Sequence, residues 1–359
     1  MNIDFHYGII YVVSRLAGLP VNEATIVAHA CQYVDDATTN GILDFADGET
    51  YERFSSAHDM LDYKNLIDDQ DRLVWAPFHF LPGGQGDTLE EKAICRPDSE
   101  IARAMMRRAI EGKKSNNSLH RLGISLHVYV DTWAHQGFSG MRSELNAVKS
   151  LSGDDHDHDK WFEALKGYLV KAGHDMQSNF LDVISKLGHG AALHFPDMPW
   201  ANWEYVNGRD AKIVRNNLPD FMAAANMACK VVQGYIKGNS QYEIEPGLTA
   251  AQFSALEKLL KLNQSHDSDI RLDNLCIAVA KGEISGLKEE VPLYIPKGDG
   301  SWKHAATGIL VIDDGNRQNK PKWSTVFENS DYRKFHDAVK QHRFVITQEI
   351  LPLHNVRIA

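Results

Sequence analysis

The 359-residue sequence predicts a mainly α fold: one multi-helix domain followed by a small C-terminal α+β extension. Three observations support this expectation. Apolar residues recur at helical spacing over long stretches of residues 8–236. Glycine, proline and asparagine interrupt these stretches at positions typical of helix ends. Short β-like runs and turn dipeptides gather in 291–323.

The first expected elements are two helices within residues 8–38, separated by the segment GLPVNEA. Asn22 is a suitable cap for the second helix, which runs into QYVDDAT. Residues 42–98 are expected to be irregular, because GILDFADG and FHFLPGGQGD are rich in turn residues. Helical spacing returns at 99–111 and at 118–136, and Gly137 supplies a stop.

Further helices are expected at about 160–187, 209–236, 249–262, 268–282 and 330–350. Residues 188–205 cannot form one helix, because Pro196 and Pro199 interrupt them. The segment GNSQYEIEPG indicates a linker near residue 240. We therefore expect a helical His/Asp metal-binding domain over 1–240 and an extension with helices and short strands over 241–359.

Composition narrows the functional classes. The formal net charge of -10 argues against strong binding to duplex nucleic acid, which needs clustered Lys and Arg. The four cysteines show no CxxC pairing, so we expect buried apolar thiols in a reducing compartment. No stretch is long and apolar enough to span a bilayer, and no export signal is evident. A cytoplasmic location is expected, with specialised secretion left open and the oligomeric state undetermined.

The stretch LHVYVDTWAHQGFSG places His127, Asp131 and His135 four residues apart. On a helix these side chains share one face, with about 6 Å of rise between neighbours and about 12 Å between the outer two. This ladder is too long for one ion, so it favours two adjacent metals with Asp131 between them. The alternative is a polar stripe on a half-buried helix, satisfied by neighbouring groups.

Other candidate ligands are scattered along the chain. Asp4 and His6 are expected on one side of an extended segment. Asp35 and Asp36 end a helix, where two acids oppose the helix dipole and need a metal or an arginine nearby. Solvation at the terminus, or an ordinary ion pair, explains these acids equally well.

Three more candidates lie in glycine-rich or proline-rich surroundings. His79 follows an apolar run and precedes turn glycines, His189 lies between two glycines, and Asp197 lies beside Pro196. A lone buried histidine is more often a core residue bonded to the backbone. His156 and His158 fall in a charged run that is typical of a solvated loop.

Taken together, His6, Asp35, His79, the HxxxDxxxH helix, His189 and Asp197 resemble the zinc-dependent phospholipase C and P1-type nuclease superfamily. The chain also resembles a group of uncharacterised bacterial proteins that share DFHYG, QYVDD and LHxYxDTxAHQGFSG. In the superfamily the N-terminal residue helps to bind metal after a signal is removed, whereas this sequence begins with Met1 and no such signal. Asp4 is therefore a candidate substitute ligand.

This resemblance implies a helical fold and a metal-dependent phosphoester hydrolase that binds two or three zinc ions, with manganese or iron as alternatives. Asp131 would bridge the ions, and Asp36 would accept a proton from water. The expected substrate is a small phosphate ester, a nucleotide or a phospholipid head group.

Two rival functions remain open. An HD-type phosphohydrolase would use adjacent His-Asp pairs, which occur at His58-Asp59, His174-Asp175 and His266-Asp267. A non-catalytic binding or sensor protein would use metals only to stabilise its fold.

Overall fold

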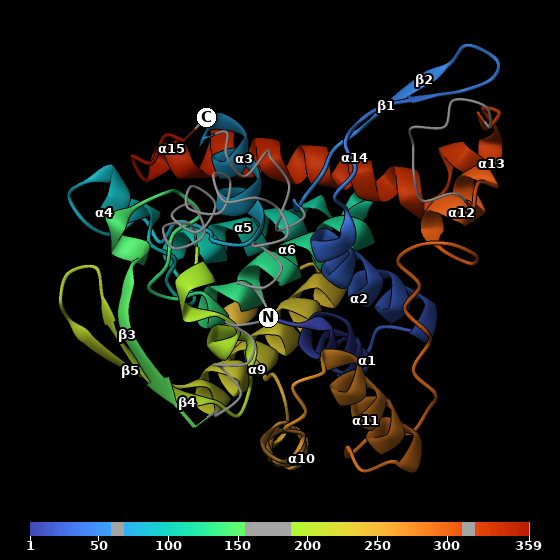
Figure 1. Ribbon diagram of the computed structural model, residues 1–359. Coiled ribbons are helices and arrows are strands. Elements are labelled where there is room, and N and C mark those ends of the chain that lie inside the picture. The colour runs from blue at the N-terminus through green and yellow to red at the C-terminus, as the bar shows by residue number, and fades with distance from the viewer. Residues whose placement is uncertain (59–67, 155–187, 311–319, 359) are drawn as a thin grey trace, which may run out of the picture.

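The structure is a computed structural model that describes residues 1–58, 68–154, 188–310 and 320–358. Its centre is helix α6 (Ser118–Ala134), which begins after Asn117 as expected. Four helices surround α6: α2 (Val21–Asp36), α5 (Glu100–Glu111), α9 (Asn217–Lys237) and α14 (Asp331–Phe344). Figure 1 shows α14 lying across one side of this group and α9 on the other.

Helices α2 and α6 approach each other closely at Gly123. A Cβ atom on this glycine would lie 2.4 Å from the carbonyl oxygen of Val27 and 2.7 Å from the Cβ of Ala30. Glycine is therefore required for the two backbones to pack at this distance. The contact fixes the position of α2, which carries Asp35, relative to the face of α6 that carries His127.

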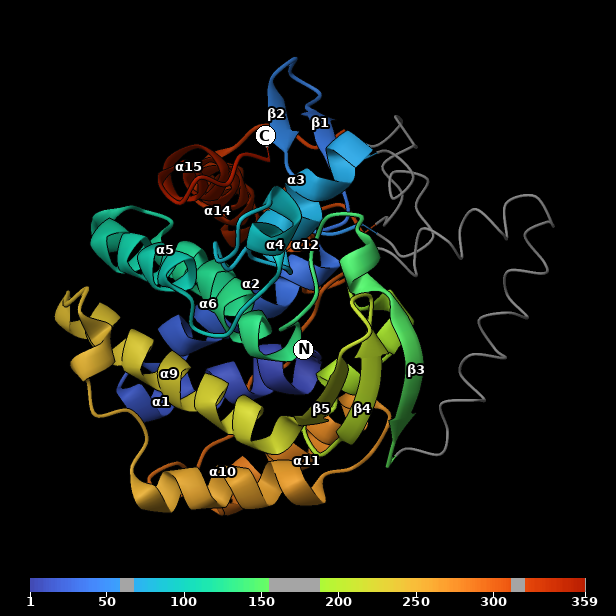
Figure 2. The ribbon, with the colours of Figure 1, turned by 90° about the vertical axis from the view of Figure 1, so that its left-hand side faces the viewer.

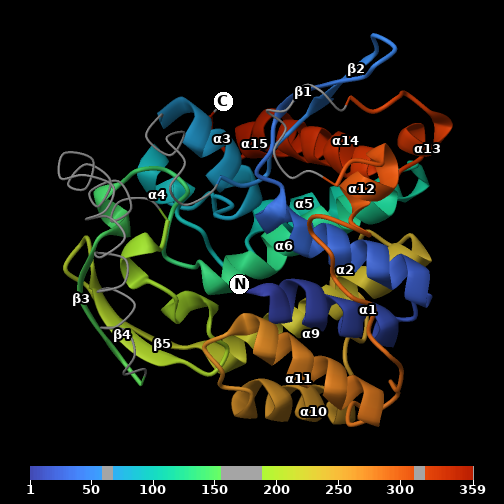
Figure 3. The same cartoon turned by 45° about the vertical axis from the view of Figure 1, so that its right-hand side comes forward.

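The N-terminal segment is helical rather than extended. A π-helical turn, η1 (Asp4–Ile9), leads directly into α1 (Ile10–Ala17). The expectation that Asp4 and His6 share one side of an extended segment is therefore wrong. Residues two apart on a helix point in different directions. Figure 3 shows the N-terminus inside the molecule, next to the C-terminal end of α6.

Two small antiparallel sheets accompany the helices. Strands β1 (Gly41–Asp44) and β2 (Thr50–Arg53) form a hairpin. Strands β3 (Val148–Gly153), β4 (Asn202–Asn207) and β5 (Lys212–Asn216) form the second sheet in that order. Trp203 of β4 lies opposite Gly153 of β3 and Arg215 of β5. Figure 2 shows this sheet beside α9 and away from α14.

These sheets correct the predicted fold class. The fold is mixed α and β rather than plainly α, and its strands lie within residues 41–216 instead of in the C-terminal extension. Among the described residues after 240, no strand is formed. The expected β-like run GILVID falls partly at 311–319, outside the described residues. In sequence, β4 alternates apolar and polar residues whereas β3 and β5 alternate weakly, so the sheet forms only through pairing of the three strands.

Several other elements differ from the expectation. The segment 42–98 contains α3 (Asp68–Phe78) and α4 (Leu89–Ala93) besides the hairpin, so it is not irregular. The helix expected from 209 begins at 217, after β5. Residues 188–205 form short 3-10 turns and the start of β4 instead of one helix, as predicted. The helix expected at 160–187 lies outside the described residues.

The C-terminal helices agree closely with the sequence pattern. Helices α10 (Ala250–Leu262) and α11 (Ser268–Lys281) are confirmed, and α14 continues into η8 (Val345–Ile350) and α15 (Leu351–Leu353). Short helices α12 (Trp302–Thr307) and α13 (Thr325–Glu328) precede α14. The remaining 3-10 turns are Gly112–Lys114, Glu144–Asn146, Gly190–Ala192, Phe195–Asp197 and Tyr242–Ile244.

The hydrophobic core crosses the boundary predicted near residue 240. One buried cluster combines apolar side chains of α1, α2, α6 and α9 with Leu260, Val279 and Ile346. Asp4 of η1 also forms a buried ion pair with Arg271 of α11. The division into 1–240 and 241–359 stays a prediction, but the two parts share core contacts. None of the described helices is long and apolar enough to cross a membrane.

Candidate metal centre

Helix α6 supplies the axis of a buried cluster of histidines and carboxylates. His127 and Asp131 lie one turn apart, and His135 follows at the C-terminal cap, where Gly137 adopts a positive φ of 89°. All three side chains are buried, with Asp131 only 1% exposed. The helix therefore directs three polar side chains into the interior.

Asp131 lies at the centre of this cluster. Its Oδ2 atom is 3.3 Å from His127 Nε2, 3.6 Å from His135 Nδ1 and 3.8 Å from His79 Nδ1. Its Oδ1 atom is 3.2 Å from His6 Nε2 and 2.7 Å from the amino group of Met1. Oδ2 has no hydrogen-bond partner among the described residues. A buried carboxylate oxygen in this position needs a cation nearby.

Two groups of three side chains flank Asp131. Asp35, His79 and His127 form the first group, in which one ligand atom of each residue lies within 4.8 Å of the others. Asp35 Oδ1 is 3.6 Å from His127 Nε2 and 3.7 Å from His79 Nδ1. The end of α2, the segment after α3 and the middle of α6 thus converge on one point.

The second group consists of His135, His189 and Asp197, again with ligand atoms within 4.8 Å of one another. Asp197 Oδ1 is 3.4 Å from His135 Nε2, and Asp197 Oδ2 is 3.5 Å from His189 Nε2. The Met1 amino group lies 3.1 Å from Asp197 Oδ1. The irregular segment before β4 is therefore the part that brings His189 and Asp197 to α6.

The hydrogen bonds of four imidazoles fix which ring nitrogen carries hydrogen. Backbone carbonyl oxygens lie 2.8 Å from His127 Nδ1, 3.0 Å from His79 Nε2, 2.7 Å from His135 Nδ1 and 3.0 Å from His189 Nδ1. A carbonyl only accepts, so each of these nitrogens is the donor. In the neutral ring the other nitrogen then offers a lone pair.

All four of these free nitrogens face carboxylate oxygens, and two of them also face each other. His127 Nε2 and His79 Nδ1 are 3.2 Å apart, and both also face Asp35 Oδ1. Lone pairs and carboxylate oxygens repel at such distances unless a cation lies among them. A shared proton or a metal ion satisfies this requirement, and the nitrogen and oxygen donors suit zinc, manganese or iron.

Burial sets the protonation of the imidazoles. Burial lowers the pKa of His6, His127 and His189 to about 4, so these rings are neutral near pH 7. For Asp131, burial raises the pKa, but His135, the Met1 amino group and His6 outweigh it and hold the pKa well below its usual range. Neutral imidazoles and ionised carboxylates are the forms that bind metals.

Burial and neighbouring charges also shift the pKa values of the Met1 amino group and Asp35. Burial lowers the pKa of the Met1 amino group, but Asp131, Asp197 and Asp35 outweigh it and raise the pKa to about 11. Burial raises the pKa of Asp35. The cluster therefore gathers three carboxylates around a small volume.

Two predicted site residues lie apart from these groups. Both oxygens of Asp4 accept hydrogen bonds from Arg271, at 2.8 Å each, because the helical turn η1 directs Asp4 toward α11. Asp36 Oδ2 accepts a 2.5 Å hydrogen bond from the Tyr294 hydroxyl. Of the two adjacent acids that end α2, Asp35 is the one that lies among the histidines. Because Asp36 is engaged by Tyr294 instead, its geometry does not support the predicted role of proton acceptor at the metal centre.

Cys31 belongs to the cluster, although the sequence indicated only a buried thiol. It is buried as expected, but its Sγ atom lies 3.7 Å from His6 Nδ1. His6, Cys31 and His127 form a third group of donors within 4.8 Å of one another. Cys31 precedes Asp35 by four residues on α2, and this spacing was the available signal in the sequence.

Other candidates fall outside the cluster or outside the described residues. His156, His158, Asp59 and the His174-Asp175 pair are not within the described residues. His266 is exposed, and the Asp267 side chain caps α11 by accepting from the amides of Asp269 and Ile270. That His-Asp pair thus has an ordinary structural explanation.

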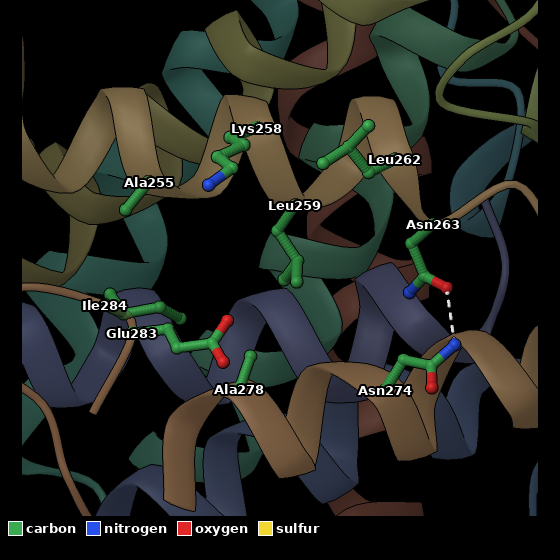
Figure 4. A pocket seen from close by; sticks show the side chains of 9 residues that line it. All are labelled: Ala255, Lys258, Leu259, Leu262, Asn263, Asn274, Ala278, Glu283 and Ile284. Carbon is green, nitrogen blue, oxygen red and sulfur yellow. Dashed lines mark hydrogen bonds between the residues drawn. The ribbon is translucent and has the colours of Figure 1, made fainter. Parts of the chain in front are cut away.

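A separate cavity of about 590 Å³ lies between α10 and α11 (Figure 4). Leu259, Leu262 and Ala278 contribute much of its apolar lining, and Asn274 donates a 2.9 Å hydrogen bond to Asn263 at one end. None of its lining residues belongs to the histidine and carboxylate cluster. The cavity therefore has no direct part in the chemistry of that cluster.

The fold and the site define a helix-rich protein of mixed α and β structure, with grouped His, Asp and Cys side chains that could bind metal ions. Residues 1–350 match the model of a family of unknown function (DUF6765), and the chain belongs to this family. No curated protein and no solved structure matched the chain. The resemblance to zinc-dependent phospholipase C and P1-type nuclease therefore stays a prediction.

Proposed function

We propose that this protein is a metal-dependent hydrolase of small phosphate esters. The observation that carries the proposal is the arrangement around Asp131, where imidazole lone pairs and carboxylates converge. The Met1 amino group pairs with Asp131 and Asp197 but lies outside the group of Asp35, His79 and His127. Asp35, His79 and His127 would hold one ion, and His135, His189 and Asp197 a second. Asp131 contacts both groups, which supports a bridging role for its carboxylate.

The donor set favours zinc, with manganese or iron as alternatives. When bound, a pair of such ions lowers the pKa of a coordinated water and polarises a phosphate ester. The protein's contribution is to fix the donors: four imidazoles are oriented by backbone carbonyls, and Asp131 is held by groups on both sides. Outer hydrogen bonds of this kind orient metal-binding histidines.

Access to solvent favours catalysis over a purely structural role. The Asp35 side chain is 34% exposed, His189 is 18% exposed and Asp197 is 14% exposed, whereas His127 and Asp131 are buried. Both groups therefore have an accessible member. Catalytic metal sites keep open positions for water and substrate, while structural sites are closed by protein ligands.

The overall charge favours a small substrate. With a net charge of -10, the protein lacks the overall positive charge that favours long nucleic acids, so the proposed substrates are phosphomonoesters, nucleotides and phospholipid head groups. The cluster's carboxylates are compensated by metal ions when these are bound, so an anionic ester can approach.

The decisive experiment measures metal content and hydrolysis on the same preparations. Wild type, Asp131→Asn and Asp35→Asn are purified, and zinc, manganese and iron per chain are counted by elemental analysis. Hydrolysis of bis-p-nitrophenyl phosphate, p-nitrophenyl phosphate, nucleotides and phospholipids is then followed near neutral pH. Asp210→Asn is the matched control, since this exposed acid pairs with Lys149.

We expect at least two ions per wild-type chain, the loss of more than one in Asp131→Asn, and a smaller loss in Asp35→Asn. Hydrolysis should disappear in Asp131→Asn and persist in Asp210→Asn. If metal-replete wild type cleaves none of these esters, the hydrolase proposal is wrong and the protein is a non-catalytic metal-binding protein. A folded wild type that takes up no metal would show that a shared proton balances the cluster.

A further inference from the structure

Five imidazoles belong to the cluster in the described part of the chain, and one ring nitrogen of each contacts a backbone carbonyl or a thiol. In His79, His127, His135 and His189 a hydrogen bond from one ring nitrogen to a backbone carbonyl fixes the tautomer. In His6 the corresponding nitrogen, Nδ1, meets the Sγ atom of Cys31 at 3.7 Å. Cys31 thus occupies the place that a carbonyl has in the other four.

Cys31 of α2 contacts two imidazole rings, each at its Nδ1 atom. The imidazoles of His6 and His127 are stacked, with centroids 3.9 Å apart and planes inclined by 20°. The Cys31 carbonyl oxygen accepts from His127 Nδ1 at 2.8 Å, while the Cys31 sulfur faces His6 Nδ1. The opposite nitrogens, both Nε2, lie 3.2 Å and 3.3 Å from the two oxygens of Asp131.

We infer that Cys31 is a positioning residue for the metal centre: its thiol sulfur accepts the His6 Nδ1 hydrogen and leaves His6 Nε2 free as a metal ligand. The inference rests on the proposed function, because metal at Nε2 requires the hydrogen to be on Nδ1. His6 Nε2 has no hydrogen-bond partner among the described residues, so it is available for this role. Cys31 therefore fixes His6 with its side chain and His127 with its backbone.

A competing assignment makes Cys31 itself a ligand, since its sulfur lies within 4.8 Å of donor atoms of His6 and His127. The geometry favours positioning over ligation. His127 Nδ1 already donates to the Cys31 carbonyl and cannot bind an ion at the same time. The Nε2 atoms of both rings instead face Asp131.

The test compares Cys31→Ala and Cys31→Val with wild type, and uses Cys229→Ala as the control for removing a buried thiol from the core. Valine fills the space of the thiol without accepting a hydrogen bond, so it separates the lost bond from a cavity. Zinc affinity is measured by competition with a chromophoric chelator. The hydrogen-bearing nitrogen of His6 is read from the ring ¹⁵N shifts of the zinc-loaded protein, assigned with His6→Gln.

Cys31→Ala and Cys31→Val should both bind zinc about 10–100-fold more weakly than wild type, which is the usual effect of removing an outer partner of a ligating histidine. Cys229→Ala should bind like wild type. In wild type the His6 signal should show hydrogen on Nδ1, and in the Cys31 variants this signal should broaden or shift. Equal zinc affinity and an unchanged His6 signal in both variants would overturn the inference.

Cobalt substitution distinguishes positioning from ligation without a variant. Cobalt-loaded wild type should lack an intense thiolate-to-cobalt charge-transfer band in the near ultraviolet, and such a band would show that Cys31 is a ligand. Wild type that takes up no zinc would overturn the proposed function and this inference together. Wild type that binds zinc, with Cys31 variants that bind it equally and keep the same His6 signal, would overturn this inference alone.

Discussion

The buried ion pair between Asp4 and Arg271 allows a quantitative prediction about how the N-terminal turn is held. Arg271 is 1% exposed, and its Nε and one terminal nitrogen donate to the two Asp4 oxygens at 2.8 Å each. Arg271 also donates to the carbonyl of Ser265 at 2.7 Å and lies over the Trp200 ring at 5.2 Å. Both charged groups are therefore shielded from solvent.

We expect Arg271→Met to lower the free energy of unfolding by about 3–5 kcal/mol, because removing one partner leaves the other charge buried and uncompensated. Asp4→Leu should cost a similar amount, because it leaves the Arg271 charge buried and unpaired. The double variant Asp4→Leu/Arg271→Met should cost clearly less than the sum, since replacing both charges avoids the unpaired state. The measurement is urea unfolding of the four proteins, followed by far-ultraviolet circular dichroism.

An exposed pair serves as the control. Lys149 and Asp210 are 46% and 79% exposed, so Asp210→Asn should change the free energy of unfolding by less than about 1 kcal/mol. A loss below about 1 kcal/mol in Arg271→Met would refute the reasoning, because the pair would then behave like one in solvent. Additive losses in the double variant would show that the two side chains do not act as a pair.

The packing and the site support three further predictions. A chelator should lower the melting temperature, and zinc at about 100 times its dissociation constant should restore about 2.7 kcal/mol, as seen by calorimetry. Gly123→Ala should destabilise the protein by about 1–3 kcal/mol in urea unfolding, because the new Cβ meets the Val27 carbonyl; in an unhindered helix the same change stabilises by about 1 kcal/mol. Burial lowers the pKa of His342 from 6.5 to about 4, so the unfolded chain binds more protons in this range and stability should fall as pH drops from 6.5 to 4. His342→Gln, measured without metal, should remove about 3 kcal/mol of the pH-dependent change in the free energy of unfolding, because glutamine does not titrate. Glutamine can still donate a hydrogen bond to the Pro77 carbonyl, so this contact need not be lost.

Each of these three has a result that would contradict it. Unchanged melting after chelation would mean that the cluster holds no metal in the folded state. A stabilised Gly123→Ala would show that α2 and α6 are not in tight contact. An identical pH dependence of stability in wild type and His342→Gln would mean that this imidazole is solvated or already protonated in the folded protein.

The polar face of α6 shows which features of the site the sequence pattern predicts and which it does not. Helical spacing predicts that His127, Asp131 and His135 share one face, and the structure brings them together around Asp131. The periodicity fixes the relative direction of side chains on one helix. The periodicity does not predict which other segments pack against that face. The residues that contact it could be proposed only from residue type and from the resemblance.

The errors have physical causes as well. The sequence pattern places Asp4 beside His6. In the helical turn, however, the two side chains point in different directions, and Asp4 pairs with Arg271, 267 residues away. Strands β3 and β5 contain polar, weakly alternating residues, so their pairing decides their structure. Cys31 lies one turn before Asp35, yet its contact with His6 depends on how α2 packs against η1.

By itself, the sequence determined most of the described helices, among them α1, α2, α5, α6, α10, α11 and α14, the face of α6 that carries His127, Asp131 and His135, and the residue types suited to metal binding. These are local properties, since helix periodicity, caps and proline act within a few residues. Tertiary structure alone decided that Asp35 rather than Asp36 joins the cluster, that His189 and Asp197 reach His135, and that Cys31 touches His6. These contacts join segments far apart in the chain, and only the packing of α2, α6 and the segment before β4 brings their atoms within a few ångströms.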